Sequence, residues 1–261
     1  MGIQARLFTD PACPASWGAE PSLRKLLVEF ADQVELTFVM GGLARELHGD
    51  PGRLVSDWLA VADRTEMPLD PRVWYEGPIA STYPACMAIK AAAMQAGDRG
   101  ARYLRTVREG LFCFRRKLDT TEALVEEARS AGLDVERFRI DLGSHATVEA
   151  FGSDLEETRA NERETLPSLR LRGEGGEERW LSAERPYPEW REAALALGGR
   201  PGGDPPAVEE ALTRFDRMAT KEVELVCDLP GPRAAAELWR LAAEWRTKPI
   251  RVLTGHLWEL A

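Results

Sequence analysis

Cys13 is the residue of this chain whose setting most suggests chemistry. It follows the strand-like run from Ile3 to Phe8 and directly precedes a helix-like stretch. A thiol at a helix N-terminus faces unpaired backbone N–H groups, and these favour the thiolate, which is the nucleophilic form of cysteine. We therefore expect Cys13 to have a lowered pKa and to act as a nucleophile.

Ser16 lies three residues after Cys13, where a dithiol redox motif places its second sulfur. A lone thiolate can attack a disulfide and form a mixed disulfide, but a serine cannot resolve that intermediate. Resolution would need a small-molecule thiol, a thiol of the bound client, or a distant cysteine such as Cys86 or Cys113. Ser16 can still donate a hydrogen bond that stabilises the thiolate. The alternative is an inert thiol retained in a binding scaffold.

Pro167 follows Leu166 immediately before a third predicted strand. Proline is tolerated at the first residue of a strand, so a structural role alone would explain it. A cis proline at this place, facing Cys13, would expose the preceding backbone to an extended peptide. Cis bonds are rare even before proline. Cys13, a helical block and Pro167 follow one another in this order in one chain. This order strengthens both the interpretation of Cys13 as a nucleophile and that of Pro167 as a cis proline.

The remaining cysteines, histidines and tryptophans give weaker signals. The four cysteines and three histidines are scattered without paired spacing, which argues against a disulfide framework and against a metal site. Cys86, Cys113 and Cys227 lie in apolar helical patterns and are expected to be small core residues. Trp17 and Trp74 are candidates for lining a cleft, with packing alone as the alternative.

Composition and charge exclude several classes of protein. A formal net charge of −9 argues against non-specific binding to nucleic acid or to an anionic membrane surface, because both need a basic patch. No stretch approaches the length of an apolar membrane span, and the N-terminus lacks the pattern of a secretory signal. We therefore expect a cytoplasmic protein with no nucleic-acid or membrane partner.

Hydrophobic periodicity gives the order strand, helix, strand, long helical block, strand, strand and helix. This is the order of a thioredoxin core with a helical insertion in its middle. The glycine-rich segment 173–176 between the last two strands is typical of a hairpin turn. The predicted strands are Ala5–Phe8, Val34–Met40, Ser168–Arg172 and Arg179–Ser182, and the predicted helices are Pro21–Phe30, Arg53–Asp63, Pro84–Ala96, Ala101–Phe114, Thr121–Ala131, Ala146–Glu164 and Tyr187–Leu197.

Residues 198–206 form the clearest linker, because their density of glycine and proline cannot hold a helix or a central strand. A small winged-helix-like module is expected after it, either as an independent docking unit or packed back on the core. From residue 205 onward the chain has eight Lys or Arg and nine Asp or Glu, so it lacks the basic excess of a DNA-binding surface. The expected elements are helices near Val208–Met218, Thr220–Cys227 and Arg233–Thr247 and a strand near Ile250–Trp258.

These residues resemble the DsbA-like thioredoxin family, in particular its cytoplasmic dithiol isomerase-like branch and the related adaptors that hand clients to the ClpXP protease. The resemblance covers about residues 1–200. Asp10-Pro11-Ala12-Cys13-Pro14 is similar to the start of the family's active-site helix, Trp17-Gly18 to the pair that follows it, and Leu166-Pro167 to its cis-proline loop. The segment 81–86 is similar to the part of the inserted domain that lies over the active site. Family members usually carry Cys-x-x-Cys, from which Ser16 departs.

The resulting expectation is an α/β protein with a thioredoxin-like core (1–42 and 143–199), an inserted helical domain (43–142) and a small C-terminal winged-helix-like α+β module (205–261). The expected activity is thiol-disulfide exchange or isomerisation through a single nucleophilic cysteine, on a protein or small-molecule substrate. The alternatives are a non-catalytic adaptor that binds a protein partner, also through the C-terminal module, and an enzyme similar to kappa-class glutathione transferases. No tightly bound cofactor is expected, although glutathione or another small thiol would serve as co-substrate. The expected catalytic residues are Cys13 and Ser16, and the expected substrate-binding residues are Pro14, Trp17, Trp74, Tyr83, Leu166 and Pro167.

Overall fold

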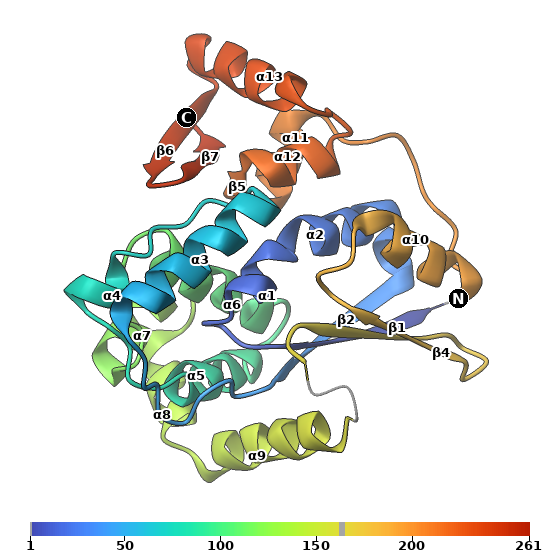
Figure 1. The fold of residues 1–261 in the computed structure, drawn as a ribbon. Coiled ribbons are helices and arrows are strands. Elements are labelled where there is room, and N and C mark those ends of the chain that lie inside the picture. The colour runs from blue at the N-terminus through green and yellow to red at the C-terminus, as the bar shows by residue number, and fades with distance from the viewer. Residues whose placement is uncertain (1, 162–164) are drawn as a thin grey trace.

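The computed structural model describes residues 2–161 and 165–261 and contains two sheets (Figure 1). The first has the strand order β2-β1-β3-β4, with β1 and β2 parallel and the other pairs antiparallel. The second has the order β5-β7-β6. The strands are β1 (Ile3–Thr9), β2 (Val34–Met40), β3 (Ser168–Arg172), β4 (Glu178–Ser182), β5 (Met218–Ala219), β6 (Thr247–Val252) and β7 (Gly255–Leu260).

The helices surround these sheets in the order expected for a thioredoxin-like core with a helical insertion. They are α1 (Pro14–Gly18), α2 (Glu20–Glu29), α3 (Pro51–Thr65), α4 (Val73–Glu76), α5 (Tyr83–Ala93), α6 (Arg99–Phe112), α7 (Thr121–Ser130), α8 (Val135–Leu142), α9 (His145–Ala160), α10 (Tyr187–Ala196), α11 (Val208–Phe215), α12 (Thr220–Val226) and α13 (Pro232–Ala243), with a 3-10 turn η1 (Ala31–Gln33) after α2.

Successive side chains of β1 point to opposite faces of the first sheet, and helices cover both faces. Ile3, Ala5 and Leu7 are buried in a core that α2 and α10 complete on one face. Arg6 points to the other face, where it forms an ion pair with Glu157 of α9. Figure 1 shows α2 and α10 on one side of the sheet and α9 on the other. The sheet thus lies between two helical layers, as the period-two pattern requires.

The inserted helices α3 to α8 pack around a separate apolar core beside the sheet. Most of them lie within two or three residues of the predicted ranges. Helices α4 and α8 were not predicted. The prediction that a helix continues to residue 164 falls partly on residues 162–164, which lie outside the described residues.

The C-terminal unit has the order helix, strand, helix, helix, strand, strand, whereas three helices followed by one strand were predicted. The single strand predicted over Ile250–Trp258 is instead a hairpin of β6 and β7, whose turn contains Leu253 and Thr254. The short strand β5 was predicted as the end of a helix. The C-terminal unit has its own apolar core, which includes Trp258, whereas Trp245 is 88% exposed.

The connection between α10 and α11 contains neither helix nor strand, as its composition predicts. It is nevertheless fixed to the end of α2. Gly202 N donates to Glu29 O at 2.6 Å, and Arg200 exchanges two hydrogen bonds with the Gln33 side chain. Figure 1 shows α12 lying beside α2, so the connection crosses the surface and the C-terminal unit packs against the core.

Candidate functional site

Cys13 lies at the turn between β1 and α1, where it occupies the N-cap position of that helix. Its extended backbone (φ −81°, ψ 114°) lets its carbonyl accept the first helical hydrogen bond from Trp17 N at 3.1 Å. Pro14 fits the first helical position because that N–H would have no partner in any case. The local sequence therefore fixes where the sulfur lies.

Leu166 lies opposite this thiol. The peptide bond between Leu166 and Pro167 is cis, and the Leu166 carbonyl oxygen lies 3.9 Å from Cys13 Sγ. The Leu166 side chain packs over Gly41, where an added Cβ would come within 2.5 Å of Leu166 Cδ1. The structure thus brings together Cys13, Pro14, Ser16, Leu166 and Pro167, residues that the sequence predicted to share one site.

The electrostatics of Cys13 differ from the expectation. Burial raises the pKa of the Cys13 thiol, and the nearby carboxylate of Asp10 raises it further. The hydroxyl and backbone N–H of Ser16 and the charge of Arg108 lower this pKa but do not outweigh burial. The predicted lowered pKa is therefore wrong for this conformation, because only 5% of the Cys13 surface is exposed. Sequence position revealed the helix end but not the burial.

Asp10 is the site residue that sequence reasoning used only as part of a motif. Its carboxylate is fully buried and accepts hydrogen bonds from Ala12 N (2.8 Å), Leu43 N (2.7 Å), Thr82 Oγ1 (2.8 Å) and Cys86 Sγ (3.4 Å). Burial raises the pKa of Asp10, while these donors lower it. Asp10 thereby fixes the turn before Cys13 to the inserted helices. An aspartate at a strand end before a helix was the available signal.

Ser16 is buried, and its Oγ has no hydrogen-bond partner among the residues that the structure describes. Because the hydroxyl favours the charged form of Cys13, this free donor is available to a thiolate or to a sulfur-linked adduct. It supplies no second sulfur.

The distant cysteines are poor candidates for resolving a mixed disulfide. Burial raises the pKa of Cys86 and of Cys113 well above the ordinary value, and it raises that of Cys227 to about 11. Cys86 donates to Asp10 and Cys113 to the Pro68 carbonyl, so both act as buried polar core residues.

Trp17 and Trp74 do not line a cleft, contrary to the prediction. Trp17 is fully buried, and its Nε1 donates to the Pro68 carbonyl at 3.0 Å. Trp74 is 5% exposed and packs edge-on against Trp58 at 5.2 Å between ring centroids. Both positions follow from long-range packing that helical spacing does not reveal.

Tyr83 is partly exposed and packs edge-on against Phe151, with ring centroids 5.1 Å apart. Both residues lie beside Gly42, whose φ of 59° places it in the left-handed region that favours glycine. Tyr83 thus remains a candidate for contact with a ligand.

No cluster of three potential metal ligands occurs within residues 2–161 and 165–261, and no helix in those ranges is long and apolar enough to span a membrane.

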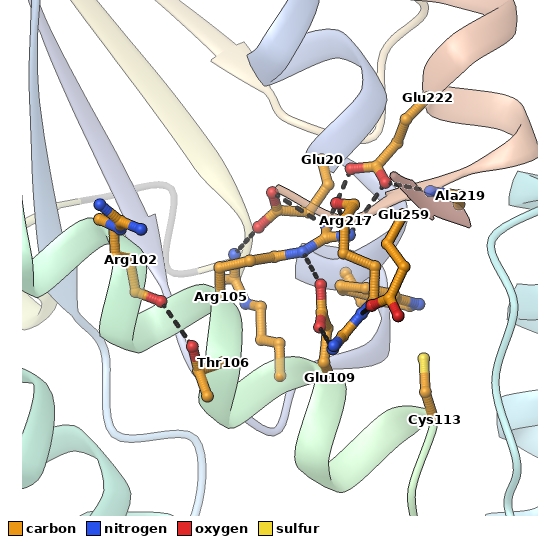
Figure 2. A network of polar contacts seen from close by, with 12 residues as sticks. Glu20, Arg102, Arg105, Thr106, Glu109, Cys113, Arg217, Ala219, Glu222 and Glu259 are labelled. Atoms are coloured by element: carbon orange, nitrogen blue, oxygen red, sulfur yellow. Dashed lines mark hydrogen bonds and ion pairs between the residues drawn. The ribbon is translucent and has the colours of Figure 1, made fainter. Parts of the chain in front are cut away.

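A buried ionic network lies behind the thiol and was not visible in the sequence. Figure 2 shows Arg105 of α6 between Glu20 of α2, Glu109 of its own helix and Glu222 of α12. Arg105 donates to Glu222 at 2.8 and 2.9 Å and to Glu109 at 2.6 Å. Although burial lowers the pKa of Arg105, these carboxylates raise it above the ordinary value.

Three further arginines extend this network. Arg24 lies 3.1 Å from Glu222, and Arg217 donates to Glu109 at 2.6 Å and to Glu259 at 3.1 Å. Arg108 donates to Glu20 and to Thr9 Oγ1. We call this set the ionic network, and its members are Glu20, Arg24, Arg105, Arg108, Glu109, Arg217, Glu222 and Glu259. It joins the active-site turn, the insertion and the C-terminal unit.

The network also touches the site through Trp17. The Arg105 guanidinium lies 4.4 Å from the Trp17 ring centroid, in cation–π contact, and the other side of the network reaches Thr9 at the end of β1. The turn that carries Cys13 thus has a contact with the network on each side, at Thr9 of β1 and at Trp17 of α1.

Comparison with known proteins finds a matching family profile, relatives of similar sequence and solved structures of similar fold. The profile of the family described as Thioredoxin matches residues 7–184. The ClpXP adapter protein SpxH of Halalkalibacterium halodurans is 31% identical, over 98% of this chain and 88% of its own length. SpxH of Bacillus subtilis is 27% identical, over 98% of this chain and 89% of its own length. The cytosolic disulfide reductase DsbM from Pseudomonas aeruginosa has a similar fold, with a TM-score of 0.64 at 20% identity over 74% of this chain and 99% of its own.

Removing one buried charge should test the ionic network. Glu222→Gln leaves Arg24 and Arg105 without their shared carboxylate, so we expect the free energy of unfolding to fall by about 3–5 kcal/mol in urea titration. The matched control is Glu224→Gln on the same helix, whose pair with Lys221 is partly exposed and should contribute at most ~1 kcal/mol. Equal effects of the two substitutions would contradict the role given to the network.

The Ser16 hydroxyl should be detectable through the pH dependence of Cys13 alkylation. Ser16→Ala removes a group that lowers the pKa of Cys13, so its rate profile with iodoacetamide should move to higher pH and the rate at pH 7 should fall at least about threefold. Peptide mapping by mass spectrometry assigns the reacting thiol, and the exposed Ser56→Ala serves as control. An unchanged profile would show that the hydroxyl does not act on the sulfur.

Proposed function

The chain belongs to the thioredoxin family, and from this premise we propose that it is an adapter that binds a client protein and presents it to the ClpXP protease. The observation that carries the proposal is the attachment of the C-terminal unit to the thioredoxin-like core through buried charges. The relatives named as ClpXP adapters align over 98% of this chain and hence include this unit, whereas the disulfide reductase DsbM covers 74%.

The state of Cys13 also favours binding over redox cycling. Burial raises the pKa of this thiol, and Ser16 occupies the place of a resolving sulfur. A mixed disulfide would therefore form slowly and persist, since no second thiol stands beside it. Slow formation and slow resolution of a mixed disulfide are unsuited to repeated redox turnover, whereas non-covalent binding of a partner beside Cys13 requires neither step.

The proposal includes a soluble protein partner and a cytoplasmic setting, where the ClpXP protease named in the relatives' titles would meet the adapter. The partly exposed residues Pro14, Tyr83 and Leu166 around Cys13 are proposed as contacts for an extended segment of the client. No duplex-binding role is proposed, because the C-terminal unit has no basic excess.

Protein half-lives in the organism that makes this chain would test the adapter function. Deleting the gene should lengthen the half-life of at least one protein in a pulse-chase experiment, and loss of ClpX should lengthen the same half-life. Cys13→Ser should restore the original half-life, because binding does not require the thiol. With purified components, the full chain should accelerate degradation of that client by ClpXP about tenfold or more. If no ClpX-dependent protein changes its half-life, the adapter function is wrong.

Thiol-disulfide exchange at Cys13 is a second candidate function. It is favoured by one observation, the 3.9 Å approach of Cys13 Sγ to the Leu166 carbonyl beside a cis proline. In this function the thiolate would attack a client disulfide and form a mixed disulfide, releasing one client thiolate. A small thiol such as glutathione would then displace Cys13.

Restoring the missing sulfur would test this candidate. Ser16→Cys places two thiols one helical turn apart, a separation that a disulfide accepts, so the variant should form a Cys13-linked internal disulfide under mild oxidant. Reduction of a model disulfide by glutathione should then be faster than with the wild-type chain, while Ser56→Cys should give no such increase. A variant that stays fully reduced, with no internal disulfide in peptide mapping, would contradict the candidate.

A further inference from the structure

A pocket of about 470 Å³ lies where the inserted helices meet the C-terminal hairpin. Its charged lining residues are Asp70, Arg72, Arg115 and Arg251, and its apolar lining includes Phe114 and Leu253. Three arginines around one pocket are notable in a chain whose net charge is −9. The pocket is distinct from the cysteine site, because none of Cys13, Ser16, Leu166 and Pro167 lines it.

The three arginines differ in how far their charge is balanced. Arg72 binds the Asp70 carboxylate through two nitrogens, at 2.8 and 2.5 Å. Arg115 lies 3.5 Å from the same carboxylate and also pairs with Glu76 at 2.8 Å. Arg251 is exposed on β6 and forms no ion pair with any residue of the described ranges. One guanidinium therefore faces the pocket without a counter-charge.

The buried carboxylate holds this arrangement in place. Asp70 is 3% exposed, and although burial raises its pKa, the hydrogen bonds and charge of Arg72 bring it below the ordinary value. Asp70 therefore stays ionised and keeps Arg72 and Arg115 aimed at one point. Arg72 and Arg115 are therefore occupied by Asp70 and Glu76, and the Arg251 guanidinium beside them is the group suited to a carboxylate ligand.

The apolar walls add a second requirement. Leu253 is 48% exposed, and the Phe114 ring is flanked by the guanidinium groups of Arg116 and Arg217 at 5.6 and 5.5 Å from its centroid. Arg217 belongs to the ionic network. Figure 2 shows Arg217 and also Cys113, which lies at the end of α6 and lines the pocket. A ligand that fills the pocket would present an apolar side chain next to its carboxylate.

The pocket exists only where two parts of the chain meet. Thr254 in the hairpin turn accepts a hydrogen bond from Leu69 N at 2.8 Å and donates one to Leu69 O at 3.1 Å. The neighbouring Pro68 carbonyl accepts from both Trp17 Nε1 and Cys113 Sγ. The segment that forms one wall is therefore held by the hairpin on one side and by the active-site helix on the other.

We propose that this pocket binds a carboxylate flanked by an apolar side chain, as an acidic residue beside leucine in a client segment would present it. Arg251 is its specificity-determining residue, and Phe114 and Leu253 receive the apolar group. The inference rests on the proposed adapter function for the source of the segment, whereas the pocket and its charge do not depend on that function.

The test uses the full chain and the unlabelled peptide acetyl-Leu-Asp-Leu-amide, with binding followed by ligand-observed NMR titration. The peptide should bind, and the analogue with Asn in place of Asp should bind at least about tenfold more weakly. Arg251→Glu should weaken binding of the acidic peptide at least about tenfold, while Arg251→Lys should stay within about threefold of wild type. The control is Arg179→Glu, an equal charge change on the exposed strand β4, which should leave binding unchanged.

Two further probes separate the sources of the carboxylate. The peptide acetyl-Leu-Leu-Leu with a free C-terminal carboxylate reports a chain end, and inorganic phosphate reports a simple anion. Arg251-dependent binding of either peptide supports the pocket and names the source. Binding of phosphate alone, equal binding of the Asp and Asn peptides without Arg251-dependent binding of the free-carboxylate peptide, or equal losses in Arg251→Glu and Arg179→Glu would overturn it. Those results would leave the ClpX-dependent half-life of a client unaffected, so failure of the pocket and failure of the adapter function are distinguishable.

Discussion

The buried charge of Arg105 is the constraint on which the rest of this structure depends. A guanidinium removed from water needs carboxylates around it, and a half-completed set would be strongly destabilising. Arg105 obtains them from three places that are distant in sequence, namely Glu20, Glu109 and Glu222. The thioredoxin-like core, the insertion and the C-terminal unit must therefore assemble together for the whole set of these charges to be satisfied.

The ionic network also contacts the residues on either side of Cys13. The Arg105 guanidinium covers the Trp17 ring, while Arg108 joins Glu20 to Thr9 at the end of β1. The active-site helix thus has little freedom to move, and Cys13 stays buried beneath the Leu166 carbonyl. A buried thiol with a raised pKa is expected to react more slowly than a thiol of lowered pKa at an exposed helix end.

Much of the fold follows from local sequence patterns. The alternation in β1 and β2 and the glycine and proline linker are specified by residues close in sequence, whereas the pairing of Cys13 with Pro167 was expected from the resemblance to the DsbA-like family. The burial of Trp17 is not, because Trp17 packs against Phe112 and Pro68 of the insertion, and the burial of Cys13 is not, because its thiol lies against the distant Leu166 carbonyl. Nor could the sequence reveal the network, since Arg105 and Glu222 are both ordinary helical surface residues in pattern. The hairpin of β6 and β7 was missed because its turn contains Thr254 rather than a strong turn dipeptide.

The central claim is that the buried charges make the core and the C-terminal unit one cooperative structure. Native-state hydrogen exchange followed by mass spectrometry tests it most directly, since it measures the free energy of opening for each segment. We expect the protected amides of α2, α6 and α12 to share one opening free energy and to lose protection together as urea is added. Exchange of α12 and α13 through a separate opening of much lower free energy, with α2 and α6 still protected, would contradict it.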